Sequence, residues 1–463
     1  MQIAKIKKIH FIGIGGIGVS ATAKLMLKLG KKVSGSDLCT SEITDKLEKK
    51  GAKIFKGHHQ NQLDNDTDLV VYSDAVPPTN PERIKAEKKN IEQISYFQFL
   101  GIITKSKKTI AVSGTNGKTT TSAILGKVLA DLGLDPTVII GSQLQEFDGN
   151  LRFGHSKYFV IEADEYYAHM LSLLPWCIFL TNIDIDHLDF YKDLNDIIEH
   201  FQKFVDGLPP NGVLFYAADD KNIQKLKLSA NSFGCSLKND KADYQAKNLQ
   251  LTEKNYEFDV YFNNEFLEHF KISLVGKYNV LNTLLVIGFC HQLKMDLGKV
   301  KKSLAEFANL WRRFETLGYL KKNDDVLVIS DYTHHPQAVK KTLQAAKEFY
   351  PNRRLFLIYQ PHQHNRTKSL FNDFIKSFNQ ADLIIIQEIY DVAGRKLEKD
   401  ENISSSDLVQ KIISQKHKNK QEILFAKNFK QTKELLNKKV KSHDLLLIMG
   451  AGDIDNLARE LTK

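Results

Sequence analysis

The sequence predicts an α/β protein of three domains: an N-terminal Rossmann-like domain, a central P-loop ATPase domain and a C-terminal Rossmann-like domain. Strand-like and helix-like segments alternate along almost the whole chain, which is typical of parallel sheets covered by helices. Glycine-rich loops follow apolar segments at residues 13–18 and 114–117. A chain of 463 residues is too long for a single core. We place the domains at residues 1–104, 105–312 and 313–463.

The composition is that of an ordinary folded protein, with 42% hydrophobic and 26% charged residues. The formal net charge is +10, and lysines are dense between Lys411 and Lys441. Because few aromatic residues interrupt these lysines, they indicate a solvated surface rather than a nucleic-acid site. We therefore expect no nucleic-acid partner.

The cysteines Cys39, Cys177, Cys235 and Cys290 are widely spaced and form no Cys-x-x-Cys pair. This spacing favours buried thiols in a reducing compartment over a disulfide or zinc framework. No apolar run approaches the length of a membrane span, so we expect a cytoplasmic protein with no membrane partner.

The first domain opens with a βαβ pattern. A strand from Ile9 ends in Gly13, Gly15, Gly16 and Gly18, a helix follows over residues 19–29, and a second strand runs over residues 32–37. Asp37 stands about 20 positions after the glycines, as in the dinucleotide-binding fingerprint. By itself this unit is equally consistent with a nicotinamide-dependent dehydrogenase.

The second domain begins with a phosphate-binding loop after a short polar linker, residues 104–108. An apolar strand from Thr109 leads into Gly114, and the loop ends in Lys118 and Thr119 at the head of a helical pattern. Only two residues separate Gly114 from Gly117, whereas the usual P-loop has four between its glycines. The backbone N–H groups of such a loop turn toward an anion. We expect Lys118 to reach the terminal phosphates and the Thr119 hydroxyl to bind Mg²⁺.

Acidic residues end a later strand of the same domain. Glu162, Asp164 and Glu165 follow the apolar run that starts at Tyr158, and His187 follows the run that starts at Cys177. A P-loop ATPase needs a carboxylate near its loop to hold Mg²⁺, and Glu162 is the candidate. Residues 243–275 have an alternating pattern that predicts antiparallel strands.

The third domain presents two polar loops directly after strands, at residues 331–336 and 360–367. Each loop holds two histidines, the second also holds Arg366, and the carboxyl edge of an open sheet is where such folds bind ligands. They lack the Cys or acidic partners that zinc requires, so anion binding explains them better. The sharp turn at residues 312–317 is expected to be a hinge.

Taken together, these motifs resemble those of the Mur ligase family, whose members join an amino acid to a carboxylate, and they follow the family order along nearly the whole chain. Residues 10–18 and 34–37 resemble the UDP-binding start, and residues 114–120 resemble the ATP loop. The remaining matches are the magnesium strands at 162–165 and 181–187, the adenine motif at 276–282, the phosphate-contacting arginine at 312–314, the third-domain signature at 331–336 and the closing glycines at 449–454.

The branch that the chain resembles implies ATP-dependent ligation of L-alanine to the lactoyl carboxylate of UDP-N-acetylmuramate in peptidoglycan synthesis. The reaction passes through an acyl phosphate, with ATP and Mg²⁺ as cofactors. UDP-N-acetylmuramate and L-alanine are then the partners, and the protein is expected to be a monomer or a weak homodimer.

The resemblance also implies residue roles. The ATP site comprises Gly114, Thr115, Asn116, Gly117, Lys118, Thr119, Thr120, Asn279, Asn282, Arg313 and Asp331. The metal site comprises Thr119, Glu162 and His187. The substrate site comprises Gly15, Gly16, Ile17, Ser36, Asp37, Ser73, Tyr332, His334, His362 and Arg366. The catalytic set is Lys118, Glu162, His187, Arg313, His334 and Arg366.

The chain departs from the alanine-adding pattern at a few positions. Asn116 and Tyr278 stand where that branch usually has His, Gln363 stands where it usually has Arg, and two tyrosines follow Glu165. These departures leave open whether the amino acid is L-alanine, glycine or L-serine. A recycling ligase that attaches a murein tripeptide to the same UDP-sugar is the alternative, and a dehydrogenase or a nucleic-acid-binding ATPase is a more distant one.

Overall fold

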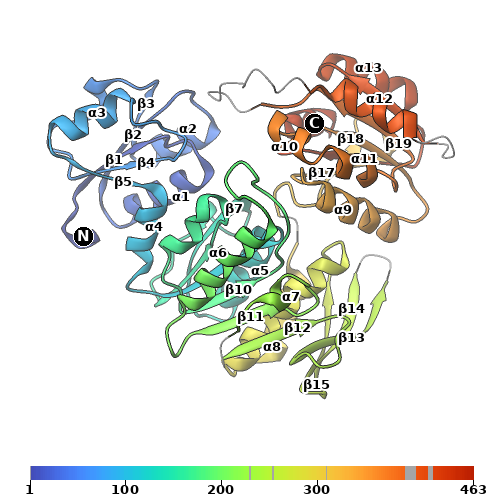
Figure 1. Ribbon diagram of the computed structural model, residues 1–463, viewed down its shortest axis with the longest axis horizontal. Helices are drawn as coiled ribbons and strands as arrows, with labels where there is room; N and C mark the ends of the chain where they lie inside the picture. Colours follow the sequence, from blue (N-terminus) through green and yellow to red (C-terminus); the bar gives the residue numbers. More distant parts are fainter. Residues whose placement is uncertain are drawn as a thin grey trace.

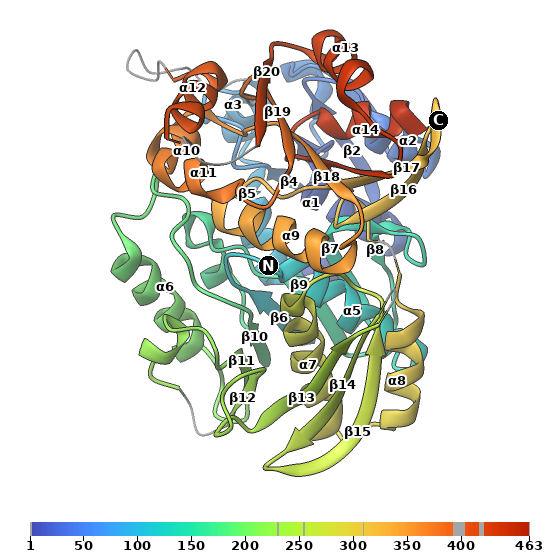
Figure 2. The ribbon, with the colours of Figure 1, turned by 90° about the vertical axis from the view of Figure 1, so that its right-hand side faces the viewer.

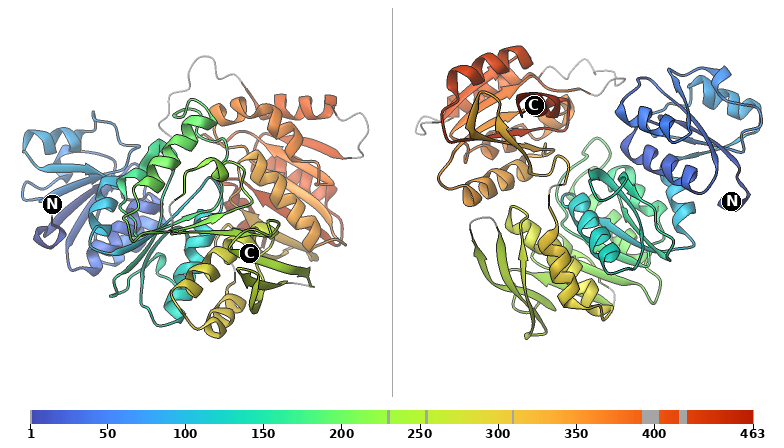
Figure 3. Two further views of the ribbon diagram at one scale, coloured as in Figure 1. Left: turned by 60° about the horizontal axis from the view of Figure 1, so that its bottom comes forward. Right: turned by 180° about the vertical axis from the view of Figure 1, so that it is seen from behind.

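The computed structural model describes residues 2–228, 231–252, 255–308, 310–391, 403–415 and 421–462. Three sheets form three bodies, and the first and third both sit on the central one (Figure 1). Figure 2 shows the third body above the central one, and Figure 3 shows the same arrangement from below and behind. The predicted fold class is confirmed. Part of the lysine-rich stretch, residues 416–420, lies outside the described residues.

The first sheet is parallel, with strand order β3-β2-β1-β4-β5. Because the order reverses between β1 and β4, their carboxyl ends flank a crevice of the kind that binds ligands in open α/β sheets. The strands are β1 Lys8–Ile12, β2 Lys32–Asp37, β3 Lys53–Lys56, β4 Leu69–Tyr72 and β5 Glu92–Ser95, and the helices are α1 Ile17–Lys28, α2 Glu42–Lys49, α3 Pro81–Lys88 and α4 Tyr96–Thr104.

The central sheet has the order β15-β14-β13-β12-β11-β10-β6-β9-β7-β8. Its strands are β6 Lys108–Ser113, β7 Thr137–Leu144, β8 Gly149–Arg152, β9 Tyr158–Glu162, β10 Cys177–Leu180, β11 Val213–Ala217, β12 Ser232–Ser236, β13 Tyr244–Leu251, β14 Tyr256–Phe262 and β15 Glu265–Ile272. The helices are α5 Lys118–Asp131, α6 Leu194–Asp206, α7 Lys277–Gln292 and α8 Leu297–Glu306, with a 3₁₀ segment η3 at Tyr166–Ser172. As predicted, β13, β14 and β15 pair antiparallel.

The third sheet has the order β16-β17-β21-β18-β19-β20. Its strands are β16 Glu315–Leu320, β17 Asn323–Asp331, β18 Arg354–Tyr359, β19 Leu383–Gln387, β20 Glu422–Ala426 and β21 Asp444–Met449. The helices are α9 Pro336–Phe349, α10 His364–Ser369, α11 Phe371–Ser377, α12 Ser405–Gln415, α13 Phe429–Lys439 and α14 Ile454–Thr462. The antiparallel edge strand β16 was not predicted, since it begins inside the expected turn at residues 312–317.

The cysteines and the helices can be compared with what the composition predicts. Cys177, Cys235 and Cys290 are buried as predicted, but the prediction is wrong for Cys39, which is exposed because it lies in the polar turn between β2 and α2. Across the described residues, every helix is too short or too polar to cross a membrane.

A buried polar network braces the first sheet. His10 on β1 lies 2.9 Å from the Ser34 hydroxyl through Nδ1 and 3.2 Å from Glu82 through Nε2. Ser36 donates to the other Glu82 oxygen at 2.5 Å, and His58 lies 3.2 Å from that oxygen. The Ser36 carbonyl in turn accepts from the N–H groups that open the glycine loop, at 2.8 and 3.1 Å. The network therefore holds in place the strand residue that binds the glycine loop at Gly13 and Ile14.

Glu82→Ala should leave the buried partners of this carboxylate unsatisfied. We expect a loss of about 3 kcal/mol of unfolding free energy, as is typical when one member of a buried pair is removed. Chemical denaturation of the full chain measures it. The control is Glu87→Ala on the exposed face of the same helix, which should change stability little. Equal effects of the two variants would show that the network does not brace the sheet.

Candidate active site

The phosphate cradle is the turn from β6 into α5. Gly114 and Gly117 have φ values of +132° and +91°, which favour glycine. A Cβ on Gly114 would lie 2.3 Å from the Thr181 hydroxyl, and one on Gly117 would lie 3.0 Å from Asn282 Oδ1. The loop therefore needs glycine at both positions, because its backbone passes close to the residue after β10 and to α7.

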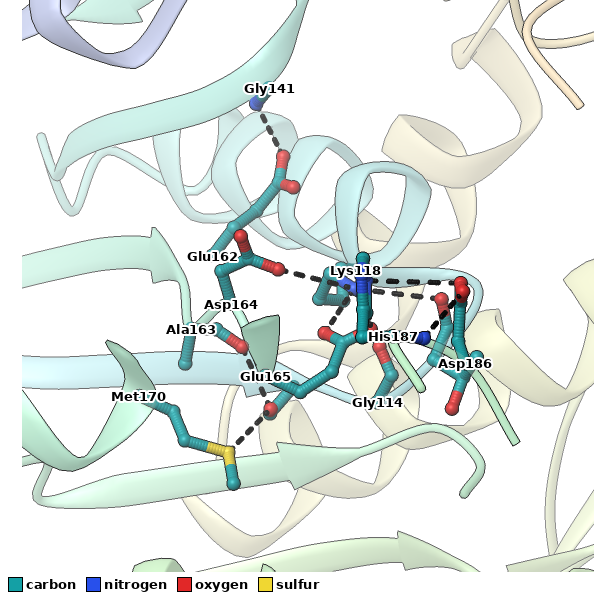
Figure 4. A network of polar contacts seen from close by, with 12 residues as sticks. Gly114, Lys118, Gly141, Glu162, Ala163, Asp164, Glu165, Met170, Asp186 and His187 are labelled. Atoms are coloured by element: carbon teal, nitrogen blue, oxygen red, sulfur yellow. Dashed lines mark hydrogen bonds and ion pairs between the residues drawn. The ribbon is translucent and has the colours of Figure 1, made fainter. Parts of the chain in front are cut away.

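Lys118 lies in this cradle against a carboxylate from the segment after β9 (Figure 4). Its Nζ is 2.5 Å from Glu165 Oε2, 3.9 Å from Asp164 Oδ1 and 2.8 Å from the carbonyl of Gly114. Burial lowers the pKa of Lys118, but Glu165 and Asp164 outweigh it, so the pKa is raised overall. Burial also raises the pKa of Glu165, and the attraction of Lys118 opposes that rise. Lys118 is consequently a charged group held where phosphates would enter.

Glu162 and Thr119 meet beside this lysine. The Thr119 hydroxyl donates to Glu162 Oε2 at 2.9 Å, and the Gly141 N–H donates to Oε1 at 2.5 Å. Arg313, which follows the linker to the third domain, donates to the same hydroxyl at 3.2 Å. Burial raises the pKa of Glu162, while the Gly141 N–H and Arg313 oppose the shift. The second and third domains therefore meet at Thr119.

His187 and Asp186 form the other rim of the cradle. His187 Nε2 is 3.8 Å from Glu165 Oε1 and 3.8 Å from Asp186 Oδ2, and its ring stacks on Tyr166 with centroids 4.3 Å apart. Arg366 of the third domain donates to Asp186 Oδ1 at 3.3 Å. Burial opposes ionisation of Asp186, but Arg366 and His187 hold its pKa below the usual range. A second contact thus joins the second domain to the third.

The third-domain histidines gather around Arg366. His362 Nδ1 is 3.5 Å from Arg366 Nη1, and the rings of His334 and His362 have centroids 5.7 Å apart. His334 Nδ1 lies 3.1 Å from the carbonyl of Tyr332, so the proton sits on Nδ1 and Nε2 is left as an acceptor. Burial, with Arg366 and His362, places the pKa of His334 well below its usual range. The imidazole is therefore neutral at pH 7.

A cavity of about 520 Å³ lies between the two domains at this point. Its lining includes Asp186, His187, Gln363, Asn365 and Arg366. It is the right size for a small polar ligand next to the cradle.

The nucleotide side carries the remaining ATP candidates. Asn282 donates to Asn279 Oδ1 at 3.1 Å, and Asn279 donates to the Val275 carbonyl at 2.8 Å. Both Asp331 oxygens accept backbone N–H groups, from Phe314 at 2.7 Å and from Thr333 at 2.8 Å. Asp331 therefore anchors the linker in addition to any role toward a ribose.

The first-domain candidates surround the glycine loop. Gly15 N–H donates to Asp37 Oδ2 at 2.8 Å, and a Cβ on Gly13 would lie 2.9 Å from that of Ser73. Gly16 and Ile17 stand at the N-terminus of α1, which favours an anion. The Ser36 side chain, by contrast, is fully buried in the polar network under the sheet. The structure does not bring that hydroxyl together with the other substrate candidates.

Tyr332 lies beside both His334 and the linker arginines, and its ring meets the His334 ring edge to face with centroids 5.4 Å apart. The guanidinium groups of Arg312 and Arg313 lie over its ring at 4.9 and 5.1 Å. Its ring therefore contacts the arginines on the nucleotide side.

The donor set beside the cradle fits Mg²⁺. Thr119 and Glu162 offer one hydroxyl and one carboxylate, and Mg²⁺ takes one or two carboxylates and completes its shell with waters and phosphates. Within the described ranges, three or more His, Cys, Asp or Glu side chains do not gather in a metal-binding cluster. These side chains therefore do not form a zinc site made of protein ligands alone.

The interdomain linker changes partners at one peptide bond. Trp311 contacts the second domain: its N–H donates to Gln143 and its carbonyl accepts from Ser142 at 2.7 Å. Arg312 contacts the third domain, where Nη2 donates to the carbonyls of Gly450 and Gly452. Arg312 itself has φ +55°, a conformation rare for a bulky residue. The Arg312 carbonyl also accepts from the third-domain Tyr332 N–H at 2.7 Å, while the Arg313 N–H donates back to the Leu310 carbonyl at 3.0 Å.

Comparison with known proteins agrees with this architecture. Three family models match the chain. The Mur ligase family catalytic domain matches residues 8–108, the Mur ligase middle domain matches residues 112–290, and the Mur ligase glutamate ligase domain matches residues 312–452. A UDP-N-acetylmuramate–L-alanine ligase of Clostridium tetani is 42% identical over 451 residues, 97% of this chain and 96% of that protein. The chain belongs to the Mur ligase family.

Other Mur ligases are similar over the same length. A UDP-N-acetylmuramate–L-alanine ligase of Caldanaerobacter subterraneus is 40% identical over 98% of this chain and 97% of its own. The solved structure of a UDP-N-acetylmuramate-alanine ligase from Thermotoga maritima covers 98% of both chains with a TM-score of 0.83 and 29% identity. A murein peptide ligase from Psychrobacter arcticus shares the fold, with a TM-score of 0.71 and 24% identity.

Sequence reasoning did not assign three residues of this Mur ligase site. Glu165 was noted only as part of an acidic cluster, yet it is the partner of Lys118. Asp186 and Arg312 join the domains, and neither was singled out for a role. His187, a few residues beyond an apolar strand, is the signal that pointed to this rim. Arg312 lay within the motif at residues 312–314 and the expected hinge, but its partners Gly450 and Gly452 are more than 130 positions away.

Gly114→Ala should close the phosphate cradle. The φ of +132° and the approach to Thr181 both reject a Cβ, so we expect ATP affinity to fall at least about tenfold. Titration calorimetry with ATP measures the change. The control is Gly133→Ala, which has φ +78° but no atom within 4 Å of the added Cβ. Undiminished ATP binding by Gly114→Ala would contradict the assignment of the cradle.

Proposed function

We propose that this chain joins L-alanine to the lactoyl carboxylate of UDP-N-acetylmuramate with hydrolysis of ATP to ADP and phosphate, in the cytoplasm and in peptidoglycan synthesis. The observation that carries the proposal is the meeting of Lys118, Thr119 and Arg313 at one point between two domains. The L-alanine ligases that it resembles over nearly their whole length support the choice of substrates. We propose the domain boundaries expected from the sequence, and a monomer or weak homodimer.

The first step needs positive charge, because a carboxylate must attack the terminal phosphate of ATP. Lys118 supplies it from the cradle and Arg313 from beside the Thr119 hydroxyl, and the charges of both act on Glu162. Thr119 and Glu162, with His187 on the opposite rim, would hold Mg²⁺, which neutralises phosphate charge when it is bound. Asn279, Asn282 and Asp331 would hold the nucleoside, and the glycine loop of the first domain would hold the UDP diphosphate.

The second step needs a neutral amine beside the acyl phosphate. Arg366 presents a planar fork that suits the carboxylate of the amino acid. Nε2 of neutral His334 is an acceptor that could take the proton which the attacking nitrogen loses as the tetrahedral intermediate forms. Attack of the amine forms a tetrahedral intermediate, and phosphate then leaves. Because the cavity lies between two domains, closure of the third domain about the linker would exclude water from the acyl phosphate.

Phosphate release dependent on both UDP-N-acetylmuramate and an amino acid tests the proposal. L-alanine should support the fastest turnover, ahead of glycine and L-serine, and Lys118→Ala is the inactive control. Turnover with a murein tripeptide in place of a free amino acid would favour the recycling ligase, whose fold is also similar. Tight NADH binding at the first domain would revive the dehydrogenase interpretation, which leaves the cradle without a function.

Arg366→Ala should lower ligation much more than ATP binding. Its guanidinium lies on the amino-acid side of the cavity, so we expect kcat/KM for L-alanine to fall by about 100-fold, while Kd for ATP changes by less than about threefold. Steady-state kinetics and calorimetry give the two values. Lys368→Ala, on the same helix and also lining the cavity, is the control for a mere change in local charge. A collapse of ATP affinity with unchanged dependence on L-alanine would contradict this role.

A further inference from the structure

One segment connects the two anion sites of the molecule. At its start, Glu165 contacts Lys118 in the phosphate cradle, and Tyr166 stacks on His187. At its other end, His169 pairs with Asp74, which directly follows Ser73 beside the first glycine loop. His169 also stacks on Phe97 of α4 with ring centroids 3.5 Å apart. The segment η3 therefore spans from the cradle to the edge of the first domain.

Tyr96, the first residue of α4, has neighbours both at the first glycine loop and at the phosphate cradle. A Cβ on Gly18, just after the first glycine loop, would lie 2.4 Å from the hydroxyl of Tyr96. The same tyrosine has its pKa raised by burial, and the charges of Glu162 and Asp164 add to that rise. The Tyr96 side chain thus lies near both the glycine loop of the first domain and the acidic residues of the phosphate cradle.

Tyr167 stands in the middle of the connecting segment with its ring in solvent. It is 49% exposed, and it lies 4.3 Å from Tyr166 and 4.9 Å from Phe190, measured between ring centroids. Phe190 is also exposed, at 36%. Exposed aromatic rings of this kind, next to the Tyr166 ring that stacks on His187, are typical of a binding surface rather than of packing.

The backbone holds Tyr167 in this position at a cost. Tyr167 and Ala168 have φ values of +50° and +54°, which are unfavourable for residues with a Cβ. The conformation is enforced on both sides: Ala168 N–H donates to the Glu165 carbonyl at 2.9 Å, and Met170 N–H donates to the Asp164 carbonyl at 2.8 Å. Strain that the surroundings enforce is found chiefly at functional sites.

We infer that the ring of Tyr167 is a contact surface for the sugar of the substrate, packing against the apolar C–H face of the pyranose. The inference rests on the proposed function, since it takes the diphosphate to the glycine loop and the lactoyl carboxylate to Lys118. The sugar lies between these two groups of the substrate, and η3 lies between the two sites. A pyranose presents an apolar face of C–H groups, and a fixed aromatic ring buries it without loss of side-chain freedom.

Binding of UDP and of UDP-N-acetylmuramate to Tyr167→Ala tests the inference, because UDP lacks the sugar. Calorimetry should show Kd for UDP-N-acetylmuramate raised about tenfold, the size of one lost aromatic contact, and Kd for UDP within about twofold of wild type. Tyr167→Phe keeps the ring and should bind both like wild type. Tyr319→Ala, which removes a similarly exposed ring from β16, is the control and should change neither.

Equal weakening of both ligands, or no weakening of UDP-N-acetylmuramate binding, would overturn the assignment of Tyr167. Failure of the proposed function gives a different result, since wild-type protein would then bind UDP-N-acetylmuramate no more tightly than UDP. The thermal midpoint of Tyr167→Ala, measured alongside, should stay within a few degrees of wild type because the lost side chain is exposed.

Discussion

The contact between the Lys118 ammonium and the buried Glu165 carboxylate joins the two segments on which the active site is built. It fixes the end of β9 to the start of α5, and so places Glu162 within reach of Thr119. A buried charge without a partner is costly, so Lys118 stays beside a carboxylate until phosphate charge replaces it. From Glu165 the chain continues into η3 and carries Tyr167 toward the first domain.

The need to bring positive groups to one place also explains the arrangement of the domains. A ligase of this kind must bring a triphosphate, a carboxylate and an amino acid together, and no single sheet edge here supplies groups for all three. Arg313 and Arg366 come from the third domain and reach Thr119 and Asp186 of the second. Since the linker changes partners between Trp311 and Arg312, the third domain would turn as one body about this point. Rotation of that body would assemble or dismantle the positive field in one motion.

Much of the fold was predictable because its signals are local. The strand at residues 32–37 has the bounds that the βαβ pattern predicts, and the cradle follows from glycines at fixed spacing. The edge strand β16 was missed because its pattern is short and half polar, and only pairing with β17 makes it a strand. Cys39 was expected to be buried and is exposed, since composition alone does not say which turn lies at the surface.

The sequence by itself determined the three-domain α/β architecture, the phosphate cradle and the family, because glycine spacing and strand-end motifs are encoded within short windows. Only the tertiary structure decided which polar and charged groups pair: Lys118 with Glu165, Asp186 with Arg366, and Ser36 with Glu82 rather than with a ligand. These partners lie 46 to 180 positions apart along the chain. Their pairing depends on how the sheets and domains pack, and on the desolvation that burial imposes, neither of which is written in a local pattern.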